Sequence, residues 1–292
     1  MKIINFYKYR ISAFIFSFFL ILFSIFLFIK DNLNLGIDFK GGFLIEVNFP
    51  TSPNLSDLRE KLISISVGNV EIQEFGSPEN VLIRIEKNSE KKDEQNALIN
   101  NIKNELPSEI DYRRIEFVGP KVGKELQIMG IKAVLFSLLA MFSYIWFRFS
   151  GWQFGLGALV ALFHDVLSTI GFFSLTQIEF NLASIAAILT IAGYSINDTV
   201  VVFDRIRENL SKKESPFSEL LNLSINQTLS RTLMTSLTTL LALLALYIFG
   251  GEVVRGFVSA MMWGVLIGTY SSIFIASPLI ALLGFKIIKQ NQ

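Results

Sequence analysis

The chain has 292 residues, of which 51% are hydrophobic and 28 are phenylalanine, and its formal net charge is +1. Its mean hydropathy of +0.50 is unusual for a soluble enzyme, and the near-neutral charge excludes the broad basic surface typical of nucleic-acid binding. The chain contains no cysteine and only one histidine, His164, which excludes disulfides, thiolate nucleophiles and metal sites built from several histidines.

The N-terminal region predicts a retained membrane anchor. Lys2, Lys8 and Arg10 precede an apolar run at 11–29, and these 19 residues are enough to cross about 30 Å of hydrocarbon. A cleaved signal peptide is the alternative, but it would have a shorter apolar core and a cleavage site with small residues. Residues 1–30 are therefore predicted to form a cytoplasmic N-terminus and the first transmembrane helix.

The polar region 31–128 is predicted to fold outside the membrane, as a periplasmic domain. Its apolar spacing predicts six elements, with the strand at 81–86 half-buried. In chain order these are a strand at 43–49, a helix at 56–66, strands at 70–75 and 81–86, a helix at 93–106 and a strand at 112–118. The order β-α-β-β-α-β is that of a ferredoxin-like α+β domain, a scaffold that serves many functions.

Five more apolar runs complete a prediction of six transmembrane helices. They lie at 129–147, 153–175, 181–203, 232–250 and 256–284. The region 129–203 then holds helices two to four, and 232–292 holds helices five and six with the C-terminus. The charged stretch 204–231 is predicted to be a cytoplasmic linker, either an amphipathic helix on the inner interface or a solvated segment.

The positions of lysine and arginine predict the orientation of these helices. With the N-terminus inside, one cation, Arg255, falls on a short outer flank and eleven fall on inner flanks. The eleven are Lys2, Lys8, Arg10, Arg148, Arg205, Arg207, Lys212, Lys213, Arg231, Lys286 and Lys289. An excess of positive charge marks the cytoplasmic side, so both termini are expected in the cytoplasm and residues 31–128 outside it.

Asp198 is the foremost candidate functional residue, because it is an ionisable group inside an apolar span. A carboxylate in hydrocarbon costs about 3 kcal/mol or more, so it usually faces a cavity, a partner or a proton path. Arg231 stands at the start of the fifth span, where its long side chain could bend toward Asp198 or extend to the interface. The alternatives are a structural carboxylate at Asp198 and an ordinary interfacial anchor at Arg231.

Four further polar residues could serve either a proton relay or helix packing. His164 and Asp165 lie near the middle of the third span, and adjacent residues point about 100° apart, so at most one is expected to line an interior path. Asn197 precedes Asp198. Thr235 belongs to a stripe of hydroxyl residues that could hold water, bond to a neighbouring helix or bond to its own backbone.

Small residues in the fourth and sixth spans predict close helix packing. Gly193 lies in the fourth span, and Gly264 and Gly268 have the spacing common at helix–helix contacts in membranes. The motifs of soluble enzymes are missing from the sequence, including the P-loop, the Gly-x-Ser-x-Gly elbow, HExxH and GxGxxG. Neither an enzymatic activity nor a cofactor or metal is therefore expected.

Several ordered motifs resemble the SecD/SecF family of protein-export membrane subunits, and within it SecF, over nearly the whole chain. The first motif is Gly-Ile-Asp-Phe-Lys-Gly-Gly, which supplies Gly36, Asp38, Gly41 and Gly42 at the entry to the outer domain. The others lie at 118–126, 163–165, 193–209 and 227–232.

The resemblance implies a role in protein export across the bacterial cytoplasmic (inner) membrane. SecF pairs with SecD, and each subunit gives six helices to an assembly similar to one transporter of the RND superfamily. The pair assists the SecYEG channel together with YajC, and is thought to use the proton-motive force to pull unfolded preprotein outward after SecA has acted. By resemblance, Asp198 is the proton-carrying carboxylate, Arg231 its charged partner, and the outer domain a contact for the emerging chain.

Two other functions remain open from the sequence. The chain could be a passive scaffold of the translocation machinery, with Asp198 only structural. It could also be half of an RND efflux transporter for small molecules, although six spans and one compact outer domain argue against that.

Overall fold

The computed structural model describes residues 4–65, 69–86, 92–107, 109–149, 151–212 and 215–283. The chain forms two compact units. The membrane unit comprises Met1–Asn34, Lys132–Ile178 and Ala183–Gln292, and the sheet domain comprises Leu35–Ile131 with Glu179–Leu182. Four cations used to predict the orientation, Lys2, Lys213, Lys286 and Lys289, lie outside the described residues, as does the C-terminal tail from 284 onward.

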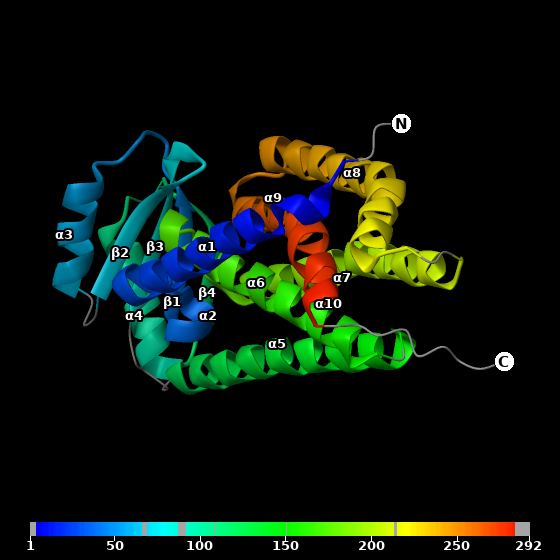
Figure 1. The fold of residues 1–292 in the computed structure, drawn as a ribbon. Coiled ribbons are helices and arrows are strands. Elements are labelled where there is room, and N and C mark those ends of the chain that lie inside the picture. Colours follow the sequence, from blue (N-terminus) through cyan, green and yellow to red (C-terminus); the bar gives the residue numbers. More distant parts are fainter. Residues whose placement is uncertain are drawn as a thin grey trace. The chain divides into compact units, whose positions relative to one another are not determined.

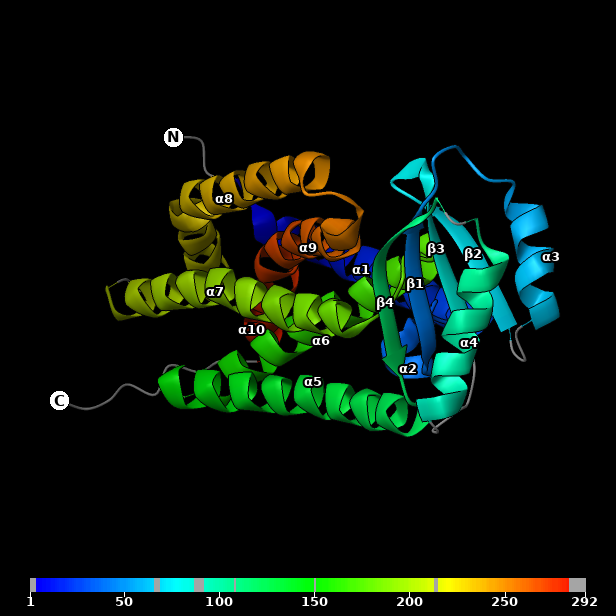
Figure 2. The ribbon, with the colours of Figure 1, turned by 180° about the vertical axis from the view of Figure 1, so that it is seen from behind.

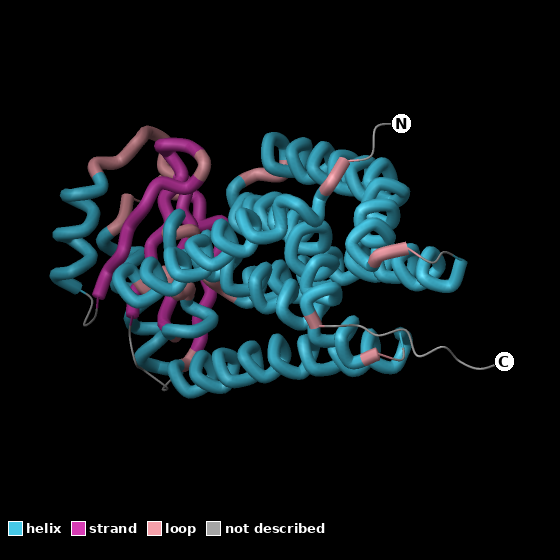
Figure 3. The backbone as a smooth tube through the Cα atoms, viewed as in Figure 1, coloured by secondary structure: helices cyan, strands magenta, loops and turns pink. Residues whose placement is uncertain are grey.

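The sheet domain is ferredoxin-like, which confirms the fold predicted from the sequence. Its strands are β1 (Gly42–Asn48), β2 (Asn69–Phe75), β3 (Ser77–Glu86) and β4 (Asp111–Val118), and its two longer helices are α3 (Leu55–Ile65) and α4 (Lys92–Glu105). The strands form one antiparallel sheet in the order β2-β3-β1-β4. Figure 3 shows the strands gathered in this domain, and Figure 2 shows α4 lying against the sheet.

Both faces of the central strands are covered. Successive side chains of a strand point to opposite faces, so Ile45 and Ile83 face the helices, where they pack with Leu62 of α3 and Ile102 of α4. On the other face, Leu44 and Leu82 pack with Ile37 of the short helix α2 (Ile37–Lys40). Strand β3 is consequently buried from Val81 to Ile85, and the predicted half-buried strand is corrected to one covered on both sides.

The membrane unit contains six helical stretches long and apolar enough to span a membrane, counted among the described residues, as the sequence predicted. In chain order the elements are η1 (Phe6–Tyr9), α1 (Arg10–Asp31), α5 (Pro120–Phe149), α6 (Trp152–Thr176), α7 (Leu182–Lys212), α8 (Phe217–Phe249), α9 (Glu252–Ser271), the π-helical turn η2 (Ser272–Ala276) and α10 (Ser277–Leu282). α6 and the stretch from α9 to α10 are the most buried, whereas α5 and α8 expose most of their apolar side chains, as lipid-facing helices do.

Several helices extend beyond the apolar runs that predicted them, because hydropathy marks only the part of a helix suited to lipid. α5 begins at Pro120, nine residues before the predicted span at 129–147. The predicted linker 204–231 is mostly helical: α7 continues to Lys212, and α8 begins at Phe217 after Pro216. The first turns of α8, which bend away from the remainder of the helix in Figure 1, bury Leu221 and Ile225 in the main core of the membrane unit.

Close helix contacts depend on small residues at particular sites. A Cβ added to Gly264 of α9 would overlap the side chain of Ile191 on α7, and one added to Gly268 would lie 3.0 Å from the Ser195 Cβ. Gly193 is different, because a Cβ there would meet nothing within 4 Å in this chain. The tightest approach was not singled out from the sequence: Gly171 of α6 packs directly on Ser24 of α1.

Candidate functional site

Asp198 lies on α7 and is only 3% exposed, yet its Oδ2 atom is buried without a hydrogen-bond partner among the described residues. Such a polar atom is rare in a folded protein, because a buried acceptor without a donor loses its solvation and gains nothing in return. The local sequence explains the burial, since Asp198 follows Ser195 by one helical turn on the face that packs against the rest of the membrane unit.

Arg231 lies on α8, and its side chain is exposed. The described residues show no direct ion pair between its guanidinium and the Asp198 carboxylate, although the positive charge of Arg231 acts on Asp198 electrostatically. The two predicted partners are thus near enough to influence each other, but no hydrogen bond ties them. Removing the charge of either side chain would break no contact in this arrangement.

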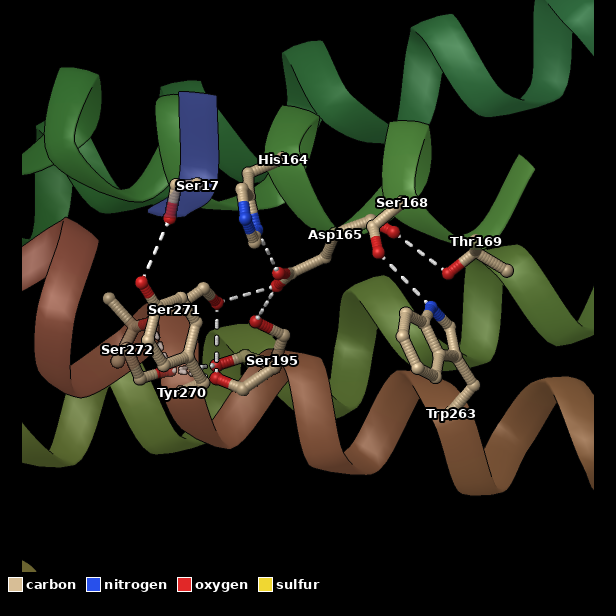
Figure 4. A network of polar contacts seen from close by, with 12 residues as sticks. Ser17, His164, Asp165, Ser168, Thr169, Ser195, Trp263, Tyr270, Ser271 and Ser272 are labelled. Carbon is tan, nitrogen blue, oxygen red and sulfur yellow. Dashed lines mark hydrogen bonds and ion pairs between the residues drawn. The ribbon is translucent and has the colours of Figure 1, made fainter. Parts of the chain in front are cut away.

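Asp165 of α6 is the opposite case, because it is fully buried and accepts several hydrogen bonds. The Ser195 hydroxyl of α7 donates to its Oδ2 at 2.6 Å, and the Ser271 hydroxyl of α9 donates to the same atom at 2.7 Å. His164 Nδ1 lies 3.0 Å from its Oδ1. Figure 4 shows these side chains converging on Asp165 from three helices, so the carboxylate joins α6, α7 and α9.

Two further hydroxyl contacts join neighbouring helices near Asp165. Ser272, the first residue of the π-helical turn, bonds to Thr199 of α7 at 2.8 Å. Tyr270 bonds to Ser17 of α1 at 3.0 Å (Figure 4). A π-helical turn often marks a functional site, and this one places hydroxyls of the last span beside α7.

His164 and Asp165 do not diverge as their adjacent positions predicted. Although the two Cβ directions differ by about 100° on a helix, the imidazole turns toward the carboxylate and both side chains are buried. His164 Nε2 has no hydrogen-bond partner among the described residues. Both side chains are therefore buried and in contact, and which of them lines an interior path stays a prediction.

The other two predicted polar residues, Asn197 and Thr235, do not bond to the Asp165 carboxylate in the part of the chain that the structure describes. Asn197 is exposed on α7. Thr235 donates to the Thr232 carbonyl at 2.9 Å and so bonds to its own helix. In the same stripe, Ser236 does reach another helix, where it lies 2.6 Å from the hydroxyl of Thr269 on α9.

Ser195 and Ser271 are the residues that sequence reasoning missed as functional candidates. Neither serine was singled out from the sequence, and both prove to be donors to Asp165. A useful signal was present in the sequence: hydroxyl residues on two other spans, together with a carboxylate in a third. Within the described chain, no group of three or more histidine, aspartate or glutamate side chains could hold a metal ion.

The glycine motif at the entry to the sheet domain has a clear geometric basis. Gly41 and Gly42 have φ angles of 78° and 119°, in a region that other residues rarely adopt. A Cβ on Gly42 would also overlap the Ile85 carbonyl oxygen. Asp38, between these glycines and Gly36, accepts the backbone N–H of Leu182 at 2.9 Å.

The chain matches known proteins over nearly its whole length. The family model described as protein export membrane protein SecD/SecF, C-terminal, matches residues 98–286. The protein translocase subunit SecF of Rickettsia bellii (strain OSU 85-389) is 45% identical over 285 residues, which are 97% of this chain and 94% of that protein. The protein of the same name from Rickettsia rickettsii (strain Sheila Smith) is 48% identical over 252 residues, covering 85% of this chain and 82% of that protein.

Solved structures agree with these sequence matches. The crystal structure of SecDF, a translocon-associated membrane protein from Thermus thermophilus, is similar with a TM-score of 0.85 and 36% identity over 97% of this chain. A structure of SecDF in a super-membrane-facing form is similar with a TM-score of 0.70 and 35% identity. This chain spans 39% of the length of each SecDF chain.

Proposed function

This chain belongs to the SecD/SecF family of protein-export membrane proteins, and we propose that it acts with SecD to couple the proton-motive force to preprotein export. Its relatives of similar length are protein translocase SecF subunits, and the longer relatives of known structure are SecDF chains. In this proposal the pair works with YajC beside the SecYEG channel, after SecA has started translocation. We infer that both termini lie in the cytoplasm and the sheet domain in the periplasm, and the distribution of lysine and arginine supports this orientation.

The observation that carries the proposal is the contrast between two buried carboxylates. Asp165 accepts two hydroxyl donors and contacts His164, so the surrounding groups hold it in one arrangement. Asp198 has a buried oxygen, Oδ2, to which no described residue donates a hydrogen bond. An ionised carboxylate in hydrocarbon costs about 3 kcal/mol or more, and gaining a proton removes that cost. Asp198 is therefore the group whose proton can come and go without breaking a hydrogen bond.

Arg231 is the second residue of the proposed proton site, and within the described structure it makes no hydrogen bond or ion pair with the Asp198 carboxylate. Its charge acts on Asp198 electrostatically, and the exposed guanidinium is free of a direct bond to that carboxylate. A direct ion pair would hold Asp198 ionised, because separating buried partners costs several kcal/mol. An indirect interaction favours the ionised form more weakly, which suits a carboxylate that must alternate between two charge states.

The test is translocation of a preprotein into inverted membrane vesicles, with and without a proton gradient. Asp198→Asn is compared with wild type and with Asp204→Asn at matched protein levels. The control changes a carboxylate of the same helix, which pairs instead with Arg148. We expect the gradient-dependent increment to disappear in Asp198→Asn and to persist in Asp204→Asn. If Asp198→Asn keeps the full increment, proton coupling at this residue is refuted and a passive scaffold takes its place.

A further inference from the structure

Residues Glu179–Leu182, here called the strap, belong to the sheet domain although the chain places them between α6 and α7. Phe180 forms a parallel β-bridge with Leu35 and accepts the Gly36 N–H at 2.9 Å. Its ring also lies 5.8 Å from the ring of Phe39, measured between centroids. The connection between two transmembrane helices is thus folded into the sheet domain by backbone pairing and by an aromatic contact.

An ion pair with a buried arginine holds the first residue of the strap. The Arg84 guanidinium, on strand β3, donates to the Glu179 carboxylate and is only 6% exposed. Arg84 lies on the sheet face opposite α3 and α4, beside Glu71 of β2 at 3.6 Å. The glycine at position 36 leaves room for the Glu179 carboxylate, because a Cβ on residue 36 would overlap it. Breaking a pair that includes a buried charge is costly, so the strap is held firmly.

The last residue of the strap is also the first residue of α7. The backbone N–H of Leu182 donates to Asp38 Oδ2 at 2.9 Å, so a side chain of the sheet domain caps this helix. The first N–H groups of a helix have no partner within the helix and carry its positive dipole end, and both favour a carboxylate. Asp38 therefore bonds directly to the backbone of the first residue of α7, and not to a loop that precedes the helix.

α7 is an unbroken α-helix from Leu182 to Lys212 and contains no proline. Asp198 lies sixteen residues from the capped end, or about 24 Å at 1.5 Å per residue. A tilt of about 5° centred on Asp198 would displace the capped end by about 2 Å. Because packed helices move as stiff bodies, a small change near Asp198 reaches the strap as a movement that a hydrogen-bonded attachment can transmit.

We propose that Asp38 and Glu179 are positioning residues that fasten the outer end of α7 to the sheet domain, so that the domain follows every movement of the helix that carries Asp198. This inference rests on the proposed function, since only a proton-driven movement of α7 needs to be transmitted. It assigns a role to the glycine motif at 36–42, because Gly36 leaves room for the Glu179 side chain and Asp38 binds the Leu182 N–H. The strap stays docked while the protein works, and it is not a latch that opens.

The first experiment locks the strap. The chain has no cysteine, so Leu35→Cys and Phe180→Cys give a unique pair at the β-bridge, where neighbouring strands bring Cα atoms within disulfide range. The full-length protein, in vesicles with its SecD partner, is oxidised and assayed for translocation with and without the proton gradient. We expect the locked protein to keep its gradient-dependent increment. Loss of the increment on oxidation, restored by reduction, would show that the strap must open and would overturn the proposal.

The second experiment loosens the strap. Asp38→Ala removes the acceptor for the Leu182 N–H, whereas Asp38→Asn keeps an oxygen that can accept it. Glu179→Gln removes the charge facing Arg84 but leaves Arg84 beside Glu71, so folding is expected to survive. Asp57→Ala, on exposed α3 of the same domain, is the matched control.

We expect Asp38→Ala and Glu179→Gln to lower the gradient-dependent increment at least about fivefold, the lower end of typical coupling between sites. Gradient-independent translocation should stay unchanged at matched protein level, whereas a merely structural defect would lower both. Asp38→Asn and Asp57→Ala should resemble wild type. If the two loosening variants keep the increment while Asp198→Asn loses it, the strap inference alone fails. If Asp198→Asn also keeps it, the proposed function fails and the inference falls with it.

Discussion

Replacing Asp165 with alanine should destabilise the membrane unit, whereas replacing Asp198 with asparagine should not. Asp165 receives one hydroxyl from α7 and one from α9, and it contacts His164 on its own helix. Its removal takes away the acceptor of the Ser195 hydroxyl and the nearer of the two acceptors of the Ser271 hydroxyl, in a fully buried place. Asp198 has no such partner at Oδ2 among the described residues, so its replacement by asparagine breaks no side-chain hydrogen bond.

The magnitude follows from the number of interhelical bonds. Hydrogen bonds between membrane helices contribute about 0.6 kcal/mol on average and about 1.7 kcal/mol at most. Two such bonds, both to one carboxylate that is fully buried, predict a loss of about 1–3 kcal/mol for Asp165→Ala. For Asp198→Asn we expect a change within about 0.5 kcal/mol, or a small gain, because a charge without a partner is costly to bury.

The assay is reversible unfolding of the purified protein in mixed detergent micelles, followed by tryptophan fluorescence. Trp263 is a suitable probe, because its indole N–H donates to the Ser168 hydroxyl at 3.1 Å beside the network. The reasoning is refuted if Asp198→Asn loses as much unfolding free energy as Asp165→Ala. It is refuted equally if Asp165→Ala unfolds like wild type, since the three contacts would then contribute nothing.

Two more predictions concern sites with different surroundings. Gly171→Ala should lose about 1–3 kcal/mol of unfolding free energy in the same assay, because its Cβ would overlap the backbone of Ser24, whereas Gly193→Ala, with open space around it, should lose none; equal losses would contradict this. Burial raises the pKa of Glu179 above its ordinary value of 4.5, and Arg84 opposes the shift. The folded domain therefore holds that proton at a higher pH than the unfolded chain, so protease resistance of the sheet domain should fall as pH rises from 4.5 through the raised pKa. Glu179→Gln should abolish this dependence, and an unchanged pH profile would contradict the assignment.

The fold was predictable because its signals are local. Long apolar runs and the alternation of strands and helices each occupy a short stretch of sequence, and they identified six spans and the ferredoxin-like domain. The ends of the helices were not predictable in the same way. Helical backbone continues past the apolar run until something stops it, so α7 extends to Lys212, and α8 begins directly after Pro216.

The candidate site was predictable only in part, because its contacts join distant parts of the chain. An apolar context was enough to single out Asp198. The donors to Asp165, however, come from residues 30 and 106 positions away, and a serine in a membrane helix is usually a packing residue. The partner of Asp38 lies 144 positions away, so the motif resembled a family signature without showing what it contacts.

Two aspartates in apolar helices look alike in the sequence, yet their hydrogen bonding differs: Asp165 accepts hydroxyl donors, and the buried Oδ2 of Asp198 has no donor among the described residues. Where hydroxyls of other helices converge, as at Asp165, the carboxylate accepts interhelical hydrogen bonds and holds α6, α7 and α9 together. At Asp198, where no described residue donates to the buried Oδ2 atom, a change of charge breaks no hydrogen bond to that atom. In the proposed function, the bonded carboxylate of Asp165 keeps the three helices together, whereas Asp198 is the group that gains and loses a proton.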